Sequence, residues 1–161
     1  MSLNRVREFL SYDPITGEFR WLQNRYRVKA GDLAGTLGSH GYLQIKCDGA
    51  LYLAHRLAWY LMTGRMPENQ IDHDNGVKTD NRWLNLRKAT NSQNGANTGI
   101  RKNNASGFKG VSYFAQTGKW HAQIMLDKKR YHLGYFDTPE EAAVAYKQRA
   151  EQHHGEFYRN A

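Results

Sequence analysis

The chain has 161 residues, with 23 lysines and arginines against 15 aspartates and glutamates, and a formal net charge of +8 at pH 7. This length suits one domain or two small ones, and the positive charge favours a polyanion as partner. The single cysteine, Cys47, excludes a disulfide framework and a zinc site built on paired cysteines, so we expect it to be a buried packing residue. The sequence lacks both a signal-peptide stretch and an apolar run of membrane-spanning length, which favours a soluble intracellular protein.

The N-terminal half is predicted to begin with a short helix and to continue as several short strands. Asp13-Pro14-Ile15-Thr16-Gly17 is typical of a turn, and Asp48-Gly49 is typical of a hairpin. A polar, basic loop is expected to extend to about Ala30, and a later helix is expected to end at Gly64. The other expected elements are strands at 18–22, 42–47 and 51–54 and that helix at 55–63.

The middle of the chain is poor in acidic residues and in large apolar ones. There is no carboxylate from Asn81 to Met125, although several lysines and arginines lie there. Such a run is often only a solvated face, but it is also what a surface that binds a nucleic-acid duplex needs. From Gln93 to Gly107 the chain is crowded with Asn, Gly, Ser and Thr, which predicts a helix tail, a linker and a domain boundary near Asn103.

The C-terminal part is predicted to contain three strands followed by one helix. The strands are expected at 110–114, 120–126 and 130–136. Thr138, Pro139 and Glu141 are typical of a capped helix start, and Gly155 is expected to end that helix. Alternation along the strands places one set of side chains toward the helix: Val111, Trp120, Ala122, Ile124, Leu126, Tyr131 and Leu133. The opposite face would carry Ser112, Phe114, Gln123, Met125, Arg130 and His132.

The segment from Ile71 to Asn94 concentrates residues suited to phosphodiester hydrolysis. It contains Ile71-Asp72-His73-Asp74-Asn75-Gly76, then Asn81, Asn85-Leu86-Arg87 and Asn94. A neutral imidazole can accept a proton from water, and a divalent cation on oxygen ligands can stabilise charge on the phosphate. Asp72 and Asn94 offer such oxygens, and His73 points away from Asp72 if both lie on one strand. The alternative is a cluster of Asn- and Asp-rich turns.

This ordered set resembles the HNH endonucleases, specifically the homing-endonuclease branch found in phages and their introns. The resemblance extends from about Tyr12 to Thr98. It implies a ββα-metal fold in which His73 is the general base and Asp72 and Asn94 bind one Mg²⁺ or Mn²⁺ ion per active site. It also implies that Asn85 ties the loop together and holds His73 in position.

Three neighbouring residues are interpreted separately. Arg87 is a candidate phosphate clamp, with a backbone contact or plain surface charge as the alternative. His55 is interpreted as structural, with a contact to DNA or to the site as the alternative. Asp74 is interpreted as a solvated loop residue.

The last third of the chain resembles the plant ethylene-response-factor (APETALA-two) DNA-binding domain over about Ser106 to Phe157. The motifs that match are Ser106–Val111, Gly118–Ile124, Leu133–Phe136 and Glu141–Tyr146. The resemblance implies a three-stranded sheet in the major groove, backed by one helix. The family's arginines are replaced at several positions while Arg130 keeps its charge, so DNA binding is expected but no target sequence carries over. The residues expected to read base edges are Lys109, Gln123, Arg130 and His132.

Together these features predict an α+β protein of two domains. Residues 1–103 would form an N-terminal β-rich extension and the HNH nuclease domain, with its catalytic core at 66–98, and residues 104–161 would form the three-strand-plus-helix DNA-binding domain. The expected function is metal-dependent, site-specific endonuclease cleavage of double-stranded DNA. We expect a monomer with neither membrane nor small-molecule partner, acting in the cytoplasm of the host cell if the gene is phage-borne. The alternatives are a DNA-binding regulator with an inactive nuclease cassette and an RNA-binding or RNA-cutting protein.

Overall fold

The structure is a computed structural model that describes residues 5–101 and 103–159. It mixes helices and strands and divides into two compact units, Met1–Ala89 and Thr90–Ala161. The division precedes the boundary expected near Asn103, because the helix α3 (Asn91–Asn97) packs against the 3-10 helix η3 (Gly155–Phe157) of the second unit. The Nζ of Lys109 also donates a hydrogen bond to the carbonyl oxygen of Ala96 at 3.0 Å. Both contacts join distant segments, and local composition does not reveal them.

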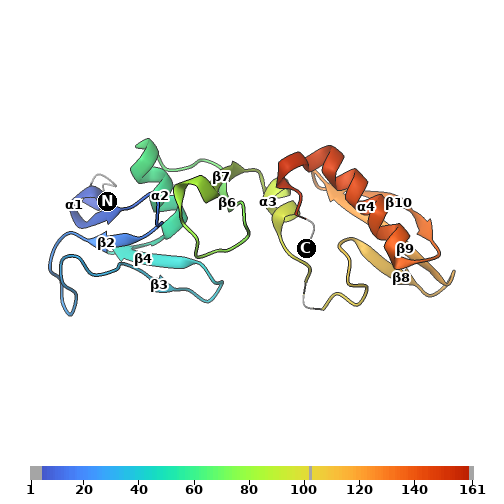
Figure 1. The fold of residues 1–161 in the computed structure, drawn as a ribbon, viewed down its shortest axis with the longest axis horizontal. Helices are drawn as coiled ribbons and strands as arrows, with labels where there is room; N and C mark the ends of the chain where they lie inside the picture. Colours follow the sequence, from blue (N-terminus) through green and yellow to red (C-terminus); the bar gives the residue numbers. More distant parts are fainter. Residues whose placement is uncertain (1–4, 102, 160–161) are drawn as a thin grey trace. The chain divides into compact units, whose positions relative to one another are not determined.

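The first unit is built from small antiparallel sheets (Figure 1). Among the described residues these sheets are β1 with β2, β3-β4-β5, and β6 with β7. In chain order the elements are α1 (Val6–Phe9), β1 (Leu10–Tyr12), β2 (Phe19–Trp21), β3 (Thr36–Leu37), β4 (Leu43–Cys47), β5 (Ala50–Leu53), α2 (Ala54–Thr63), β6 (Gln70–His73), the 3-10 helix η2 (Trp83–Asn85) and β7 (Leu86–Ala89).

The hydrophobic core of the first unit forms where α2 packs on the β4–β5 hairpin. Ile45, Cys47 and Leu57 are fully buried there, which confirms Cys47 as a buried packing residue. Asp48 and Gly49 both have positive φ, at 48° and 79°, as a two-residue hairpin turn of the favoured twist requires. The helix α2 starts directly after β5 and packs on both strands of this hairpin.

The β6–β7 hairpin carries the segment in which the sequence predicts chemistry. Its antiparallel pairing places Asp72 opposite Arg87 and His73 opposite Leu86. Ile71 and Leu86 belong to the core of the first unit, so the hairpin is fixed against that core. Because successive side chains of a strand point to opposite faces, Asp72 and His73 enter different surroundings.

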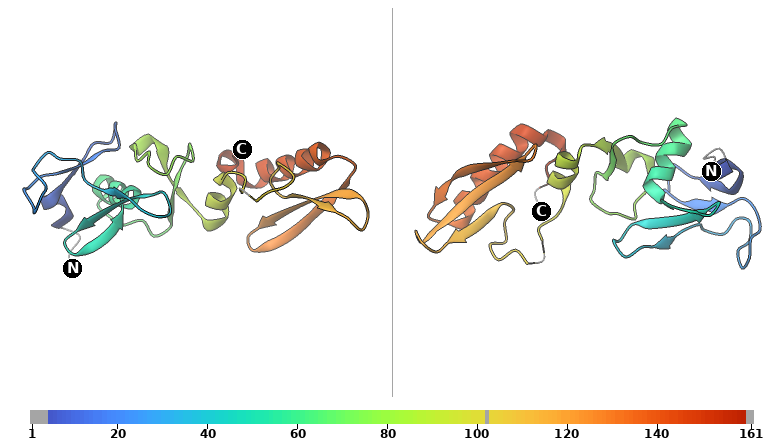
Figure 2. Two further views of the ribbon diagram at one scale, coloured as in Figure 1. Left: turned by 90° about the horizontal axis from the view of Figure 1, so that it is seen from below. Right: turned by 180° about the vertical axis from the view of Figure 1, so that it is seen from behind.

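The second unit contains a three-stranded antiparallel sheet with α4 on one face (Figures 1 and 2). The strand order is β10-β9-β8, and the elements are β8 (Val111–Phe114), β9 (Lys119–Leu126), β10 (Lys129–Phe136) and α4 (Pro139–His154). Thr138 and Glu141 form the capping box that the sequence predicts, with Pro139 in the first turn. Each of the three strands begins within one residue of its expected start and ends at its expected last residue.

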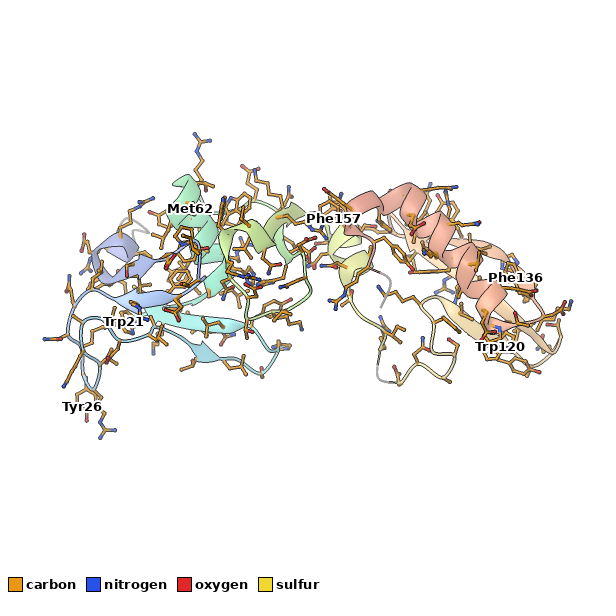
Figure 3. The ribbon with its side chains drawn as sticks, viewed as in Figure 1. Trp21, Tyr26, Met62, Trp120, Phe136 and Phe157 are labelled. Atoms are coloured by element: carbon orange, nitrogen blue, oxygen red, sulfur yellow. The ribbon has the colours of Figure 1, made fainter. Side chains whose placement is uncertain are left out.

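Small residues bring α4 close to the sheet. Ala122 on β9 and Ala142 and Ala150 on α4 are fully buried, and Trp120 and Phe136 pack at the same interface (Figure 3). A Cβ added at Gly110 would lie 2.2 Å from a ring carbon of Tyr146, so only glycine fits at that position. The other face of the sheet faces away from α4.

Among the residues described, no helix combines the length and apolar character that a membrane crossing requires.

Candidate active site

Asp72 is a buried carboxylate held by an arginine across the hairpin. It is 5% exposed, and its Oδ2 accepts a hydrogen bond from Nε of Arg87 at 3.1 Å. The same guanidinium contacts Asp74 through Nη1 and Oδ1 at 2.5 Å, and the Asp74 side chain is 58% exposed. Arg87 therefore bridges a buried and an exposed carboxylate. To bind a phosphate as the sequence predicts, it would exchange its contact with exposed Asp74 for that ligand.

His73, the next residue on β6, lies in a buried pocket of rings and amides. Its ring centroid is 5.0 Å from that of His55 and 5.9 Å from that of Tyr42. Its Nε2 lies 3.3 Å from Oδ1 of Asn81, whose own Nδ2 donates to the carbonyl of Thr79. Because an amide oxygen only accepts, Nε2 carries the proton and the lone pair lies on Nδ1. The loop thus fixes both the orientation and the tautomer of His73.

The surroundings of His73 keep its imidazole neutral. Burial lowers its pKa from the ordinary value, while the hydrogen bond to Asn81 and the nearby carboxylates of Asp72 and Asp80 act in the opposite direction. The net shift is downward, so the neutral form persists below the pH at which an exposed histidine becomes charged. A neutral, oriented imidazole is the form that can accept a proton from water.

Asn85 closes the loop that leads from β6 to β7. Its Oδ1 accepts a hydrogen bond from the backbone N–H of Asn75 at 2.9 Å, and its Nδ2 donates to the carbonyl of Asp80 at 2.7 Å. One side chain therefore joins both ends of the loop that contains Asn81. This is the geometry that the loop-tying role expected for Asn85 requires.

The N-terminal turn at 13–17 supports the same loop, which sequence reasoning did not foresee. Trp83 N–H donates to the carbonyl of Pro14 at 2.9 Å, and the Tyr12 hydroxyl donates to the carbonyl of Asn81 at 2.7 Å. A Cβ on Gly17 would lie 2.5 Å from the backbone nitrogen of Arg82. The turn signal was visible in the sequence, but its partner was not.

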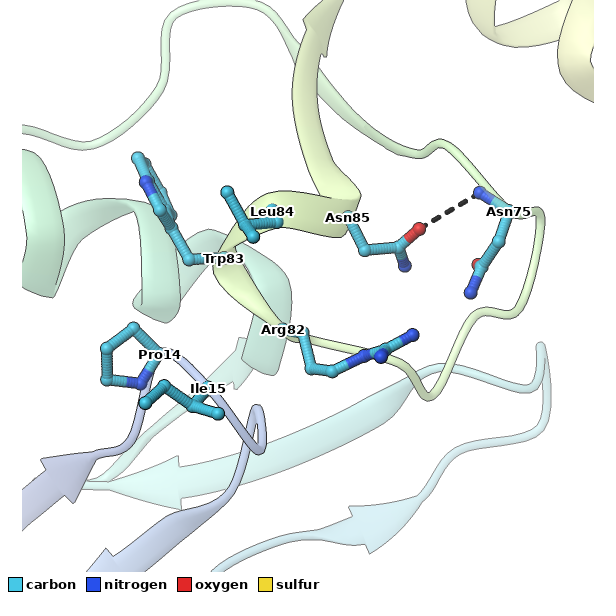
Figure 4. A pocket seen from close by; sticks show the side chains of 7 residues that line it. All are labelled: Pro14, Ile15, Asn75, Arg82, Trp83, Leu84 and Asn85. Atoms are coloured by element: carbon cyan, nitrogen blue, oxygen red, sulfur yellow. Dashed lines mark hydrogen bonds between the residues drawn. The ribbon is translucent and has the colours of Figure 1, made fainter.

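A pocket of about 480 Å³ lies beside this loop (Figure 4). Asn85 is the predicted site residue that lines it, and its hydrogen bond to Asn75 is visible there. The other lining residues are Pro14, Ile15, Arg82, Trp83 and Leu84. Neither Asp72 nor His73 lines this pocket, so it is distinct from the surroundings of the predicted base.

His55, interpreted from the sequence as structural, is buried against His73. Burial is the main reason that its pKa falls from 6.5 to about 3, and electrostatic interactions with the neighbouring His73 and Arg56 act in the same direction. Its Nδ1 has no hydrogen-bond partner among the described residues. His55 therefore packs as a neutral ring behind the predicted base.

This burial predicts a loss of stability in acid. The unfolded chain takes up a proton on His55 near pH 6.5, whereas the folded chain does so only near pH 3. The contribution of neutral His55 to the free energy of unfolding is therefore complete above pH 6.5. It falls as the pH drops from 6.5 toward 3, by up to about 1.4 kcal/mol per pH unit. The thermal midpoint of His55→Phe should fall less between pH 7 and pH 5 than that of the wild type. Exposed His40→Phe is the control, and equal pH dependence in all three proteins would contradict the assignment.

Asn94, the other predicted metal ligand, lies on α3 in the second unit. A capping box of Thr90 and Gln93 starts this helix directly after β7. The chain therefore turns from the hairpin into a helix that carries Asn94 in its second turn. Its role as a ligand stays a prediction.

The base-reading residues predicted in the second unit divide into two groups. Gln123, Arg130 and His132 lie on the sheet face away from α4, with Gln123 paired to His132 in the register. Lys109 differs from the prediction: its Nζ donates to the carbonyls of Ala96 and Arg159, at 3.0 and 2.6 Å. Burial lowers the pKa of Lys109, and its charge stabilises the packing of α3 rather than facing outward from the sheet.

Sequence reasoning also missed His121 on the same sheet face. Its Nε2 lies 2.6 Å from Nδ1 of His132, and the two rings stack with centroids 4.7 Å apart. Burial, with His132 and Arg130 nearby, lowers the pKa of His121. Alternation along β9 places it beside Gln123, so this signal was available.

Comparison with known proteins finds a family match in the middle of the chain. A model of the HNH endonuclease family matches residues 52–96. The chain is 31% identical over 106 residues to Protein 3.8 of Escherichia phage T7, an alignment that covers 65% of this chain and 87% of that protein. The chain therefore contains an HNH endonuclease domain at residues 52–96. It is also 29% identical over 153 residues to the Uncharacterized HNH endonuclease L560 of Acanthamoeba polyphaga mimivirus, covering 92% of this chain and 71% of that protein. No solved structure matches the chain.

The HNH segment contains the whole β6–β7 hairpin. It therefore includes the residues for which catalytic or ligand roles are predicted: Asp72, His73, Asn85, Arg87 and Asn94. The C-terminal sheet lies outside this HNH segment. The match to this family supports a nuclease, and the buried His73 lies within the matched part of the chain.

Proposed function

We propose that this protein is a metal-dependent DNA endonuclease in which His73 is the general base. The observation that carries the proposal is the His73–Asn81 contact within the HNH segment, which leaves Nδ1 with the lone pair. A base must be both neutral and oriented before it can take a proton from water. Burial supplies the first property, and Asn81 supplies the second.

The chain's own residues divide the work around this base. His73 accepts a proton from the attacking water at Nδ1. Asn85 holds the loop that contains Asn81, and thereby positions His73. Arg87 lies at the surface side of Asp72, where it can bind a phosphate oxygen after release from Asp74.

Asp72 and Asn94 would hold one divalent cation, Mg²⁺ or Mn²⁺. Their oxygens are the hard donors that these ions prefer, although the carboxylate of Asp72 is paired with Arg87 in this structure. No cluster of three or more His, Cys, Asp or Glu residues in the described part of the chain could hold a metal. A site of Asp72 and Asn94 would therefore be completed by water and phosphate oxygens. A bound ion polarises the phosphate and stabilises the leaving oxygen.

The second unit would bind double-stranded DNA and choose the target, as in a homing-type nuclease. Support comes from the exposed sheet face with Gln123, Arg130 and His132, and from the resemblance of this segment to the APETALA-two domain. We propose that the protein is a monomer. We also propose that it acts on DNA in the cytoplasm of the host cell, since the relatives named above are viral.

The sheet face makes a separate prediction about DNA affinity. Arg130→Ala should weaken binding to the preferred duplex by about 1–3 kcal/mol if Arg130 reads a guanine, and should leave the metal requirement unchanged. Lys147→Ala removes an exposed charge from α4 and serves as the control. Competition binding against unrelated duplex measures both. Equal losses in the two variants would remove the sheet face from target choice.

The direct test of the function is incubation with supercoiled plasmid and phage DNA, with Mg²⁺ or with EDTA. Relaxed circles would indicate nicking, and linear product would indicate double-strand cleavage. His73→Ala protein is the matched control for contaminating nuclease. Plasmid unchanged with every divalent metal, while DNA binding persists, would overturn the nuclease and leave a DNA-binding regulator.

A further inference from the structure

The loop between β2 and β3 is strongly basic and has no role in the site described above. Residues 22–35, between these strands, contain Arg25, Arg27 and Lys29 against one carboxylate, Asp32, which accepts a hydrogen bond from the backbone N–H of Lys29 at 2.7 Å. The loop extends from the body of the first unit, with Tyr26 at its end (Figures 1 and 3). Its composition combines positive charge with an aromatic ring at one exposed point.

Several contacts hold the part of the loop that lies next to the body of the first unit. The guanidinium of Arg25 lies 4.5 Å from the ring centroid of Trp21, and Val28 packs against the core of the unit. The side-chain oxygen of Asn24 accepts a hydrogen bond from the backbone N–H of Ala30 at 2.9 Å. These contacts hold the two ends of the loop, and they thereby position its tip.

The tip itself is a tight turn with an unusual residue. Arg25 and Val28 exchange both backbone hydrogen bonds, at 2.8 and 3.0 Å, so Tyr26 and Arg27 are the two central residues. Arg27 has φ of 60°, a conformation that turns normally give to glycine or asparagine. The left-handed conformation costs a residue with a side chain about 1–2 kcal/mol. Turn formation alone therefore does not explain an arginine here.

The side chains at the tip face solvent. Tyr26 is 85% exposed, and the guanidinium of Arg27 lies 5.0 Å from its ring centroid. Lys29 is also exposed, and within the residues described neither Arg27 nor Lys29 has a recorded ion pair. A large ring and two cations are thus exposed together at the tip of the loop.

We infer that this tip is a second contact with the DNA duplex, in which Arg27 and Lys29 bind backbone phosphates and Tyr26 packs against the sugar. The side chains of the tip suit the DNA backbone, because cations bind phosphates and a ring can cover the apolar edge of deoxyribose. The choice of DNA as partner rests on the proposed function. The contact lies in the first unit and is separate from the exposed sheet face of the second.

Arg27→Gly gives a sharp test because stability and binding should move in different directions. Glycine relieves the left-handed conformation, so the thermal midpoint should stay equal or rise. Loss of one phosphate contact should lower duplex affinity and reduce the slope of log affinity against log salt by about 0.9. Between 50 and 200 mM salt, the affinity of this variant should then fall by about 3.5-fold less than that of the wild type.

Three further variants of the full-length protein complete the design. Arg27→Lys keeps the charge and should keep the wild-type salt slope, whereas Tyr26→Ala should lower affinity without changing that slope. Arg65→Ala removes an exposed arginine at the end of α2 and should match the wild type. If Arg27→Gly binds like Arg65→Ala in affinity and slope, the inference is overturned.

Binding is measured in EDTA with duplex DNA, and cleavage is measured separately with Mg²⁺. A protein that never cleaves but loses affinity on Arg27→Gly would overturn the nuclease and support the contact. A protein that cleaves normally, with Arg27→Gly unchanged in binding, would overturn the contact alone. Equal loss of affinity for an acidic polypeptide would show a general polyanion site rather than a DNA contact.

Discussion

Replacing His73 by alanine is expected to slow DNA cleavage by about 10²- to 10⁴-fold, the usual contribution of a positioned base. Binding of duplex DNA should be unchanged, because His73 is buried and the charges proposed to bind DNA lie elsewhere. Single-turnover cleavage and equilibrium binding in EDTA measure the two quantities separately. Cleavage within a few-fold of the wild type would show that His73 is not the base.

Asn81 provides the matched test of how His73 is held. Asn81→Leu removes the acceptor for Nε2 but retains a buried side chain of similar size. Since burial lowers the pKa of His73 and the Asn81 bond raises it, this variant should lower that pKa further. The acid limb of kcat/KM, where the base becomes protonated, should then move to lower pH as the maximal rate falls. An unchanged pH profile would contradict the hydrogen bond as the positioning contact.

Loss of the proposed metal site is expected to slow cleavage about as strongly as loss of His73. EDTA should abolish cleavage, and Asp72→Asn should require far more Mg²⁺ for activity, because an amide replaces the charged ligand with little change in shape. Asn94→Ala should lose less activity than Asp72→Asn, since Asn94 supplies a neutral oxygen. Titration of the cleavage rate with Mg²⁺ and with Mn²⁺ gives the apparent affinities.

Asp74→Asn is the control for Asp72, because both carboxylates contact Arg87 but the Asp74 side chain is 58% exposed. It should change the Mg²⁺ requirement little. An equal effect of Asp72→Asn and Asp74→Asn would point to the Arg87 contact rather than to metal binding. Stoichiometric zinc that survives dialysis and supports cleavage would contradict a Mg²⁺ or Mn²⁺ site.

The sequence by itself determined the elements whose signals are local. The β8, β9 and β10 strands and the capped start of α4 were predicted closely, because alternation and the Thr138–Glu141 capping box depend on residues a few positions apart. The Asp48-Gly49 hairpin and the adjacent Asp72 and His73 on one strand belong to the same class.

The tertiary structure decided what depends on residues distant in the chain. Lys109 looked like a base-reading residue until its ammonium was found on the carbonyls of Ala96 and Arg159. The same kind of contact assigns α3 to the second unit. The neutral tautomer of His73 depends on Asn81 and on the burial that His55 and Tyr42 help to create. Charge and spacing identify a side chain with a suitable functional group. Its hydrogen-bond partners and its desolvation are determined only when segments distant in the chain pack together.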